Sequence, residues 1–500
     1  MFDLDVSEID SVNVRVHCDK GIAHELSDYF TFKVPGYKFM PAYRSRMWNG
    51  EIKLYNIHTQ TIYAGLVEYI QKFADERKYT ITLPSRNAFT TTAADVQGFM
   101  EDFLNVQVHG KKVSPHEHQI NAVQHAMQEE RCLLLSPTGS GKSLIIYALL
   151  RYYLSKIPKD KKVLIIVPTV SLVEQMFSDF TDYSSANGWD VQTNCHKILA
   201  GADKATQKRV VISTWQSIYK QTEKYFEQFG AVVGDEAHLF KSKSLTAILT
   251  KLKRCPFRVG TTGTLDGTDT HRLVLEGLFG RAYEVTKTKA LMEKKILSDL
   301  KIDCILLSYP DIDRESVKRA KYPDEIKWII GSTRRNRFIA NLCKSLKGNS
   351  LILFQFVEDH GKLLNTMVRD CIPMERKVFF VYGGTEASER EEIRKIVETE
   401  SDAVIIASYG TFSTGISIRR LNNIIFASPS KSRIRVLQSI GRQLRVAEDK
   451  TTARLYDLGD DLSWKTWKNH TLRHMNERMK LYEAEGFEHK VVKIQLGEDT

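Results

Sequence analysis

Residues 131–154 read RCLLLSPTGSGKSLIIYALLRYYL, and this stretch decides the fold class. Its first five residues form a short, mostly apolar run, which predicts a buried strand. The apolar run that starts at Leu144 is too long for a strand and predicts a helix. A strand, a glycine-rich loop and a helix in this order are the context that a phosphate-binding loop requires.

The loop offers groups that suit a nucleotide phosphate. Its two glycines allow a tight turn, so that backbone N–H groups and the start of the helix face the phosphates. Lys142 is expected to reach the β- and γ-phosphates, and the Ser143 hydroxyl to ligate Mg²⁺. The alternative is a glycine turn before a helix with an incidental Lys-Ser pair. The expected ATP-binding residues of the loop are Ser136, where the strict pattern has its first glycine, and Thr138, Gly139, Ser140, Gly141, Lys142 and Ser143.

A second stretch, AVVGDEAHLF at residues 231–240, places two carboxylates after a buried strand. In an open α/β sheet, ligands bind at the carboxyl ends of the strands. Asp235 therefore fits as the Mg²⁺ partner, and Glu236 as the base that polarises the attacking water. An acidic pair after a strand is usually a solvated loop, but the phosphate loop upstream favours an ATPase site.

Short apolar runs alternate with amphipathic stretches along most of the chain, which predicts parallel sheets covered by helices, in the α/β class. The predicted strands lie at 131–136, 162–168, 209–214 and 231–236, and again at 350–356, 377–383, 403–408 and 423–428. The charged segment 286–336 is the predicted connector. We expect a small α+β domain at 1–95, which is strand-like with one helix at 64–76, and two α/β domains at 96–282 and 283–500.

The composition narrows the partners and the compartment. A net charge of +11 and a pI near 9.1 favour an anionic partner, most simply nucleic acid. The seven cysteines form no CxxC pair, so free thiols in a reducing compartment are expected. The acidic N-terminus MFDLDVSEID has no signal-peptide pattern and no run of about 18 apolar residues occurs. We therefore expect a cytoplasmic protein, in the host cytoplasm if a phage encodes it, with no membrane partner.

The motifs DEAH (residues 235–238) and SPTGSGKS (residues 136–143) resemble motifs II and I of superfamily 2 helicases of the DExH branch. The resemblance extends from Ser114 to the last helices, with the motifs in the family order. It implies two tandem RecA-like domains and ATP-driven movement along nucleic acid. Within SPHEHQINAV, Gln119 resembles the glutamine of the family's glutamine motif and is the implied reader of adenine.

Further motifs of the first α/β unit resemble those that contact nucleic-acid phosphates. VPTVSLVEQ and ISTWQSI match them at Pro168, Thr169, Thr214 and Gln216. GTTGTL resembles motif III, which implies that Thr262 and Thr264 link the ATP site to the nucleic-acid face. Taken singly, each of these stretches is also open to reading as a helix cap.

The second α/β unit matches the remaining motifs. LILFQF resembles motif IV, with Gln355 as a backbone contact, and ASYGTFSTGISI resembles motif V, with Thr414 on nucleic acid and Gly415 on the nucleotide. QSIGRQLR resembles motif VI, which implies catalytic roles for Gln438, Arg442 and Arg445. The two arginines are three residues apart, so they share a helix face, and either is the implied γ-phosphate finger. ATP would then close two domains, and hydrolysis would let them reopen.

The N-terminal segment 29–56 interleaves eight aromatic residues with five basic ones. This pattern suits phosphate contacts with base stacking, or a wedge into a junction, although the aromatic residues could equally form a small core. Arg44, Arg46 and Lys53 are the expected DNA contacts, and Asn49-Gly50 predicts a hairpin turn.

This module ahead of a DExH core resembles small phage recombination and repair helicases. The resemblance implies an ATP-dependent, 3′-to-5′ DNA helicase that acts on forks, junctions and D- or R-loops, by unwinding or branch migration. Its implied partners are branched DNA, single strands next to duplex and RNA–DNA hybrids, with replication or recombination proteins as further candidates; we expect a monomer. Alternatives are a DExH RNA helicase, a double-strand translocase, and a DNA binding and annealing factor with a regulatory ATPase.

Overall fold

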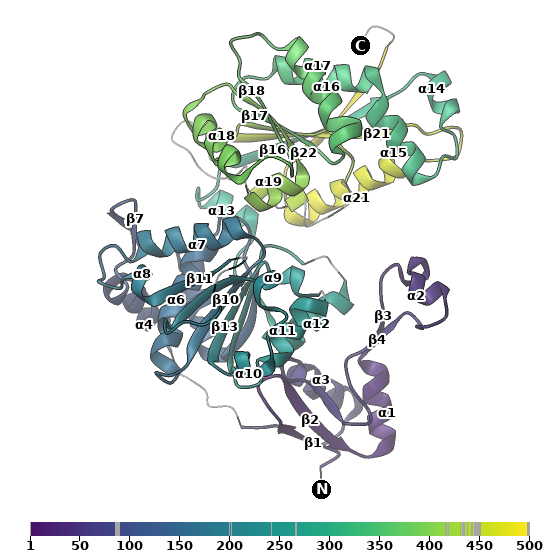
Figure 1. Ribbon diagram of the computed structural model, residues 1–500. Helices are drawn as coiled ribbons and strands as arrows, with labels where there is room; N and C mark the ends of the chain where they lie inside the picture. The colour runs from purple at the N-terminus through teal and green to yellow at the C-terminus, as the bar shows by residue number, and fades with distance from the viewer. Residues whose placement is uncertain are drawn as a thin grey trace. The chain divides into compact units, whose positions relative to one another are not determined.

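The structure is a computed structural model that describes residues 2–497, apart from 86–90, 200, 202, 242, 266–267, 416–417, 419, 431, 433–435, 438, 442–443 and 445–451. The chain divides into two compact units (Figure 1). The first holds residues 1–136 and 141–286, and the second holds residues 287–500 together with 137–140. Among the described residues, no helix combines the length and the apolar composition that crossing a membrane would need.

A four-stranded sheet, in the order β5-β2-β1-β6, opens the first unit. The strands are β1 (Leu4–Glu8), β2 (Asn13–Cys18), β5 (Thr61–Tyr63) and β6 (Ile81–Thr82); β1 pairs antiparallel with β2 and parallel with β6. The 3₁₀ turn η2 (Ala64–Leu66) and helix α3 (Val67–Arg77) form the predicted helical stretch. The prediction of one helix here is wrong, because α1 (Lys20–Tyr29) forms as well. Asp19 caps α1 by accepting from the Ile22 N–H, and Leu26 is buried against the sheet.

An extended arm joins α1 to β5. Strands β3 (Thr31–Lys33) and β4 (Glu51–Lys53) pair antiparallel, and the connection between them carries the turn η1 (Tyr37–Phe39) and helix α2 (Pro41–Arg44). The predicted hairpin turn at Asn49-Gly50 is therefore wrong. Gly50 instead ends the long connection with a φ of +84°, and its carbonyl oxygen accepts from the Val34 N–H.

The N-terminal sheet is packed directly on the following α/β part. Tyr69 of α3 donates a 2.6 Å hydrogen bond to the buried carboxylate of Glu276, which lies on α12 (Asp269–Phe279). A Cβ on Gly65 would lie 2.0 Å from the Glu276 carbonyl oxygen, so this contact requires glycine. Leu273 of the same helix belongs to the N-terminal core. Both parts therefore share one continuous packed unit.

The rest of the first unit contains a seven-stranded parallel sheet in the order β11-β12-β10-β13-β14-β9-β15. All four predicted strands form, as β9 (Arg131–Leu135), β10 (Lys162–Val167), β12 (Val210–Thr214) and β13 (Phe229–Asp235). The prediction missed β11 (Cys195–Ile198), β14 (Phe257–Thr262) and β15 (Ala282–Glu284). The helices are α4 (Ala93–Gly98) with the π turn η3 (Phe99–Phe103), α5 (Glu117–Glu129), α6 (Lys142–Lys156), α7 (Val170–Tyr183), α8 (Val191–Asn194), α9 (Trp215–Ile218), α10 (Glu223–Phe226), η4 (Ala237–Lys241), α11 (Lys243–Lys251) and α12. A small hairpin, β7 (Gln107–Val108) and β8 (Lys111–Lys112), precedes α5.

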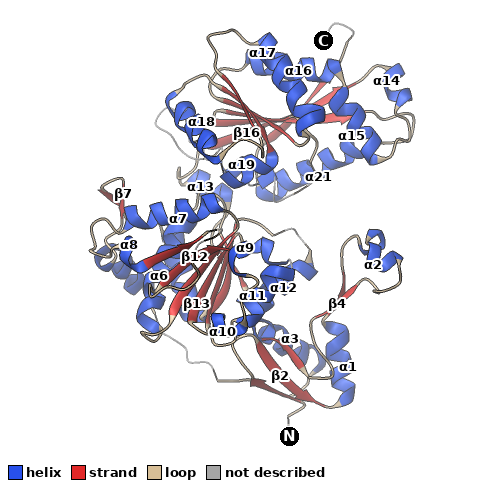
Figure 2. Ribbon diagram, viewed as in Figure 1, coloured by secondary structure: helices blue, strands red, loops and turns tan. Residues whose placement is uncertain are grey.

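Alternate side chains along each strand point to opposite faces of the sheet, so they belong to two different cores. Cys132 and Leu134 face the core formed with α5, α6 and α7, whereas Leu133 faces the core formed with α9 to α12. Helices accordingly cover both faces of each large sheet, as Figure 2 shows. Because both faces are buried, these strands read as continuous apolar runs in the sequence.

The second unit repeats this architecture with the parallel order β18-β19-β17-β20-β21-β16-β22. The predicted strands are β17 (Ser350–Phe354), β18 (Val378–Val381), β19 (Val404–Ser408) and β20 (Asn423–Phe426), joined by β16 (Asp299–Ser308), β21 (Thr452–Asp461) and β22 (His489–Gln495). Its helices are α13 (Thr288–Glu293), α14 (Asp311–Ser316), α15 (Tyr322–Gly331), α16 (Thr333–Ser345), the π turn η5 (Val357–Gly361), α17 (Lys362–Cys371), α18 (Ala387–Thr399), α19 (Tyr409–Gly415) and α21 (His470–Glu485). The fold class is thus confirmed as α/β with two tandem parallel-sheet domains and a small N-terminal domain.

The prediction that residues 286–336 form a connector is wrong. The segment contains β16, which lies between β21 and β22 inside the second sheet. In the first half of β16, polar residues such as Asp303 alternate with apolar ones, so the apolar run of this strand is confined to residues 304–307. The second α/β alternation therefore begins before Gly348.

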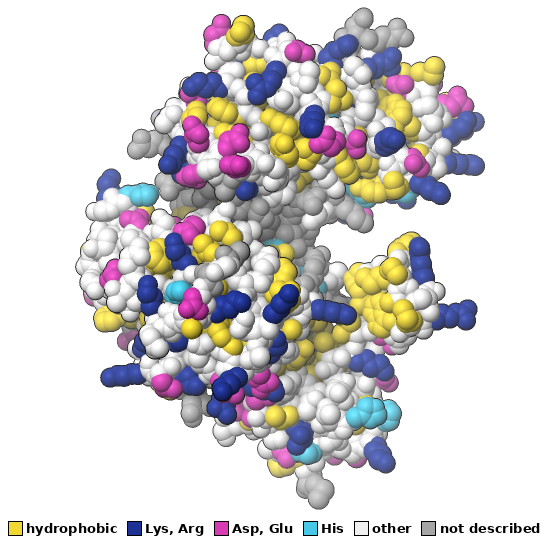
Figure 3. All heavy atoms as spheres, viewed as in Figure 1, with side chains coloured by type: hydrophobic (Ala, Val, Ile, Leu, Met, Phe, Trp, Pro, Cys, Tyr) yellow, Lys and Arg dark blue, Asp and Glu magenta, His cyan; other side chains and the backbone are white. Residues whose placement is uncertain are grey.

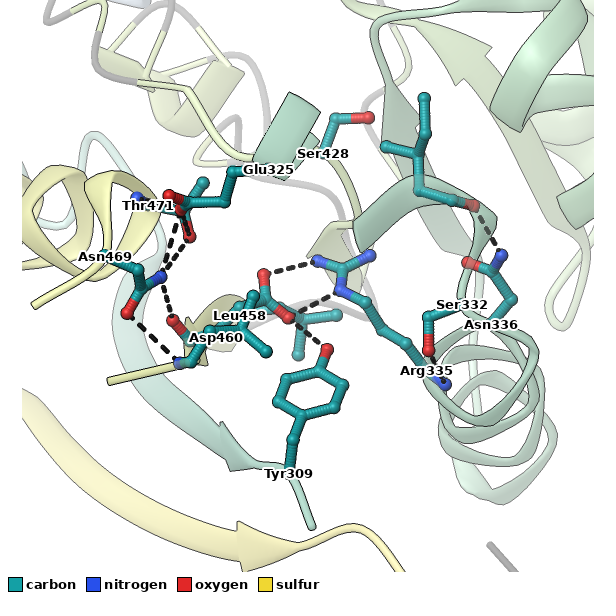
Figure 4. Close-up of polar contacts among 12 residues, drawn as sticks. Tyr309, Glu325, Ser332, Arg335, Asn336, Ser428, Leu458, Asp460, Asn469 and Thr471 are labelled. Carbon is teal, nitrogen blue, oxygen red and sulfur yellow. Dashed lines mark hydrogen bonds and ion pairs between the residues drawn. The ribbon is translucent and has the colours of Figure 1, made fainter. Parts of the chain in front are cut away.

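Buried polar groups hold the carboxyl edge of the second sheet together (Figure 4). Arg335 and Asp460 are both fully buried and form a two-pronged ion pair, with Nε–Oδ1 at 2.7 Å and Nη2–Oδ2 at 3.2 Å. The Tyr309 hydroxyl donates to the same carboxylate at 2.7 Å. Nearby, the buried Glu325 carboxylate accepts from the backbone N–H groups of His470 and Thr471 and thereby caps α21.

The Arg335–Asp460 pair generates a stability prediction. In Asp460→Asn, the guanidinium of Arg335 stays buried without its counter-charge. We therefore expect the free energy of unfolding of the second unit to fall by about 3–5 kcal/mol. The exposed pair Lys362–Glu358 provides the control, since Glu358→Gln should cost at most about 0.5 kcal/mol. Calorimetric unfolding of the full chain measures both, and an equally small change for the two variants would contradict the role of the buried pair.

Candidate nucleotide site and nucleic-acid edge

The order of the first sheet brings the candidate ATP residues to neighbouring strand ends. Strands β13, β14 and β9 are adjacent and parallel, so the loops that follow them meet at one edge. Asp235 ends β13, Thr262 ends β14, and the phosphate loop follows β9. Residues that lie about 130 positions apart in the chain therefore share one location.

The phosphate loop has the backbone that its sequence predicts. Gly139 and Gly141 have φ values of +87° and +82°, which favour glycine. A Cβ on Gly141 would also lie 2.1 Å from Nε2 of Gln119. Gln119 is buried in the first turn of α5, and its Oε1 accepts from the His116 N–H at 2.9 Å, so its amide nitrogen faces the loop. The structure thus brings the glutamine of the predicted adenine motif to the phosphate loop.

The backbone at Ser136 shows why this loop does not need a glycine at the position where the strict pattern has its first one. Unlike the two glycines, Ser136 does not have a positive φ. Its N–H donates to the Thr262 carbonyl at 2.8 Å, and its own carbonyl accepts from Lys142 Nζ at 3.1 Å. The side chain is completely buried, so only a small residue fits. Ser140 Oγ closes the loop by donating to the Pro137 carbonyl at 2.6 Å, with Thr138 between them.

Asp235 is almost entirely buried at the end of β13. Its Oδ1 accepts from Thr261 Oγ1 at 2.8 Å. Burial raises the pKa of the Asp235 carboxyl, the neighbouring Glu236 raises it further, and the Lys142 ammonium opposes both. A bound cation would remove this penalty by favouring the charged form.

Glu236 begins a chain of contacts that links two motifs. It has a φ of +50°, and its Oε2 lies 3.3 Å from Nδ1 of His238. The same nitrogen lies 3.0 Å from Thr262 Oγ1, whose hydroxyl donates to the Thr264 carbonyl at 3.1 Å. Because that hydroxyl hydrogen goes to Thr264, the nitrogen of His238 is the donor toward Thr262. The acidic motif and the threonine motif are therefore coupled directly.

Three residues of this site escaped the sequence analysis. Tyr183 lies with its hydroxyl 2.9 Å from Ser143 Oγ. Thr261 supports Asp235, and His271 Nε2 donates to the His238 carbonyl at 2.9 Å. Thr261 could have been found, since it sits next to Thr262 in the same motif. Tyr183 and His271 lie on helices far along the chain, where no sequence pattern marks them.

The donor set fits a magnesium-bound nucleoside triphosphate. Two glycines with positive φ form the turn of the loop, Lys142 supplies a cation, and Ser143 and Asp235 supply oxygen ligands of the kind that Mg²⁺ prefers. In the described part of the chain, no group of three or more His, Cys, Asp or Glu residues is arranged to hold a metal ion.

The other half of the same edge carries the candidate nucleic-acid residues. Thr169 follows β10 and caps α7 by accepting from the Leu172 N–H at 3.3 Å; Pro168 precedes it. Thr214 ends β12, its Oγ1 lies 3.0 Å from Ser217 Oγ, and Gln216 is exposed on α9. The Thr169 hydroxyl thus caps a helix, whereas the Thr214 side chain makes no capping bond. Both residues lie on the opposite side of β13 from β14 and β9.

In the second unit, the candidate residues follow adjacent strands. Gln355 follows β17 and is exposed, and its N–H donates to Ser428 Oγ at 3.0 Å. Thr414 and Gly415 lie in α19, directly after β19. Gln438, Arg442 and Arg445 lie outside the described residues.

The N-terminal candidates lie on the arm. Arg44 on α2, Arg46 just after it and Lys53 on β4 are all exposed. Four of the eight aromatic residues belong to or pack against the core of the N-terminal sheet, with Phe30 and Tyr55 buried in it. Phe39 is 77% exposed. Figure 3 shows hydrophobic and basic side chains side by side at this arm.

Three family models match successive parts of the chain. Residues 3–84 match "DNA helicase UvsW, N-terminal", residues 112–267 match "Type III restriction enzyme, res subunit", and residues 333–447 match "Helicase conserved C-terminal domain". The matches follow the N-terminal domain and the two parallel-sheet domains in order.

The similarity to known proteins extends over almost the whole length of this chain. The chain is 34% identical to the ATP-dependent DNA helicase uvsW of Enterobacteria phage T4, over 99% of this chain and 100% of the relative. A crystal structure of T4 UvsW matches with a TM-score of 0.53 at 33% identity, over 99% of this chain and 100% of that one. The DNA 3'-5' translocase XPB2 of Sulfurisphaera tokodaii is 23% identical, over 80% and 89% of the two chains. Since the identity to the T4 protein extends through all three parts described above, this chain belongs to the UvsW family of superfamily 2 DNA helicases.

Proposed function

We propose that this chain is an ATP-dependent DNA helicase that translocates on DNA and unwinds or branch-migrates forks, junctions and D- or R-loops. The observation that carries the proposal is the linked set of strand ends, in which Lys142, Asp235 and Glu236 meet beside His238 and Thr262. Such an edge can bind a nucleotide and transmit its state to the neighbouring strand ends.

The roles of the individual side chains follow from their positions. Lys142 balances the charge of the β- and γ-phosphates, and Glu236 orients and polarises the attacking water. Mg²⁺ held by Ser143 and Asp235 would neutralise the charge that develops on the phosphate oxygens. His238 holds Glu236 and Thr262 in one network, so a change at the carboxylate reaches the threonine motif. Gln438, Arg442 and Arg445 keep their expected role as further ligands of the γ-phosphate.

The neighbouring half of the edge is the proposed track for one DNA strand. Pro168, Thr169, Thr214 and Gln216 lie at the ends of β10 and β12, next to β13. Their hydroxyl and backbone groups suit contacts to DNA phosphates and not to bases. Movement of the helicase along the strand should therefore not depend on the DNA sequence. We propose 3′-to-5′ movement, the direction that the name of the translocase relative states for that protein.

The N-terminal arm is the proposed contact with branched DNA. Exposed arginine and lysine side chains around exposed Phe39 and Met47 offer phosphate contacts together with apolar surface. An RNA helicase remains the second candidate from the shared core, and the N-terminal match to a DNA helicase module favours DNA.

Lys142→Arg tests the ATP site. The planar guanidinium cannot replace an ammonium that reaches back to the Ser136 carbonyl, so hydrolysis should fall about 10²–10³-fold while DNA binding persists. Lys156→Arg makes the same change at the other end of α6 and should leave turnover unchanged. Steady-state ATPase rates and DNA titrations measure both effects, and normal turnover in Lys142→Arg would refute the assignment.

The substrate class is tested by comparing nucleic acids. ATPase and strand-separation rates are measured with forked DNA, linear duplex, single-stranded DNA and RNA. We expect the largest stimulation with forked DNA, because the arm and the strand-end track would engage it together. Stimulation by RNA alone would favour the RNA helicase, and binding or annealing without strand separation would favour a regulatory ATPase.

Removing two charges from the arm tests its contact with DNA. Arg44→Gln with Arg46→Asn should weaken fork binding and lower the slope of log K against log salt by about 1–2, if each side chain neutralises one phosphate. Asparagine is chosen at position 46 because it tolerates that residue's φ of +57°. Lys20→Ala with Lys72→Ala removes two exposed charges from α1 and α3 of the same domain as the control. If the slope of log K against log salt is unchanged in the arm variant, the arm does not contact DNA through these residues and has a structural role only.

A further inference from the structure

Ser428 occupies a central position at the carboxyl edge of the second sheet. It follows β20, which pairs with β17, and β17 in turn pairs with β19. The residue is 1% exposed, and its two oxygen atoms bind groups that follow the ends of β17 and β19. Its Oγ accepts from the Gln355 N–H at 3.0 Å, and its carbonyl accepts from the Tyr409 hydroxyl at 3.2 Å.

These two bonds reach the two segments that carry the candidate DNA contacts of this unit. Gln355 lies after β17 with its side chain exposed, so the backbone is anchored while the side chain faces outward. Tyr409 is the first residue of α19, the helix that contains Thr414. One serine therefore links the loop after β17 to the start of the helix after β19.

A buried relay behind Ser428 sets the orientation of its hydroxyl. His360 Nδ1 lies 2.9 Å from Ser428 Oγ, and His360 Nε2 lies 3.1 Å from Asn336 Oδ1. Asn336 donates its amide nitrogen to the Ile330 carbonyl at 2.8 Å, so its oxygen is the acceptor for His360. Figure 4 labels Asn336 and Ser428 next to the Arg335–Asp460 pair.

The protonation state of His360 completes the relay. Burial lowers the pKa of His360 to about 3, with a further contribution from the Arg335 charge, so the ring is neutral at physiological pH. Its Nε2 carries the proton that Asn336 accepts, which leaves Nδ1 as an acceptor. Ser428 must then donate its hydroxyl hydrogen to His360, and its oxygen lone pairs remain for Gln355. Every hydrogen bond of this relay thus has a defined direction.

We propose that Ser428, held by His360, is a positioning residue for DNA: it keeps the Gln355 loop and α19 in register so that both contact the same strand. The inference rests on the proposed function of this edge. The Ser428 hydroxyl holds the loop after β17 and its carbonyl holds the start of α19, so a displacement of one reaches the other. A backbone fixed in this way has less conformational entropy to lose on binding phosphate.

Ser428→Ala tests the proposal. The change leaves the Gln355 N–H without its acceptor, so we expect the KM for DNA in stimulated ATP hydrolysis to rise about 5- to 30-fold. ATP hydrolysis without DNA and kcat at saturating DNA should stay within about twofold of the unaltered chain, because the backbone carbonyl of residue 428 still holds α19, which carries Gly415.

Ser350→Ala is the matched control. Ser350 is an equally buried serine on the neighbouring strand β17, at the opposite end of the sheet, where its hydroxyl donates to the Gly348 carbonyl at 3.0 Å and accepts from Asn423 at 3.1 Å. We expect the Ser350→Ala variant to lose about as much thermal stability as Ser428→Ala, with an unchanged KM for DNA. An unchanged KM in Ser428→Ala, or an equal rise in Ser350→Ala, would overturn the proposal.

Tyr409→Phe supplies a second variant that keeps the volume of the side chain and therefore the fold. It removes only the bond from α19 to the Ser428 carbonyl and should raise the KM for DNA about threefold, which corresponds to the loss of one ordinary hydrogen bond. An unchanged KM for DNA would show that the bond between α19 and Ser428 does not matter for DNA binding and would overturn this part of the proposal.

The unaltered chain distinguishes the two proposals. If DNA does not stimulate its ATP hydrolysis at all, the proposed function fails. If DNA stimulates it normally and the KM for DNA is unchanged in the variants, only the positioning role is refuted.

Discussion

The constraint on which the structure depends is the parallel pairing of β13, β14 and β9, which brings three distant loops to one edge. Each loop alone has an ordinary local role: a glycine turn, an acidic strand end, a threonine at a strand end. Hydrogen bonds between Ser136 and Thr262, and between Thr262 and His238, make them one assembly. Parallel pairing of β10 with β13 and with β12 extends this edge, so the candidate nucleotide residues and the candidate DNA contacts lie on one sheet edge.

Much of this could be predicted from the sequence because strands buried on both faces appear as uninterrupted apolar runs. The same rule explains the failures. Strand β16 carries polar residues such as Asp303 and was read as part of a connector. Helix α1 is short and lies in an aromatic segment, so its cap at Asp19 went unnoticed. Asn49-Gly50 has the composition of a hairpin turn, but the chain continues through α2 before it returns as β4.

Motif spacing marks some residues of the candidate site in the sequence, whereas tertiary packing brings in others that no motif marks. Lys142, Ser143, Asp235 and Glu236 are recognisable from their local context. Tyr183 and His271 reach the site from α7 and α12, and Ser428 and His360 act through a buried relay that leaves no periodic signal. The second unit therefore carries buried polar groups behind the exposed candidate contact Gln355, and these groups fix the backbone of its loop.

The central claim is that Ser143 and Asp235 hold one divalent ion against the phosphates that Lys142 and the loop bind. A crystal structure with Mn²⁺ and a non-hydrolysable ATP analogue tests it directly, because the anomalous signal of manganese locates the ion. The account predicts one peak within coordination distance of Ser143 Oγ, with the Asp235 carboxylate bound to the ion directly or through one water, and Tyr183 displaced from the serine hydroxyl. A triphosphate bound away from residues 136–143, or an ion with no contact to either side chain, would contradict it.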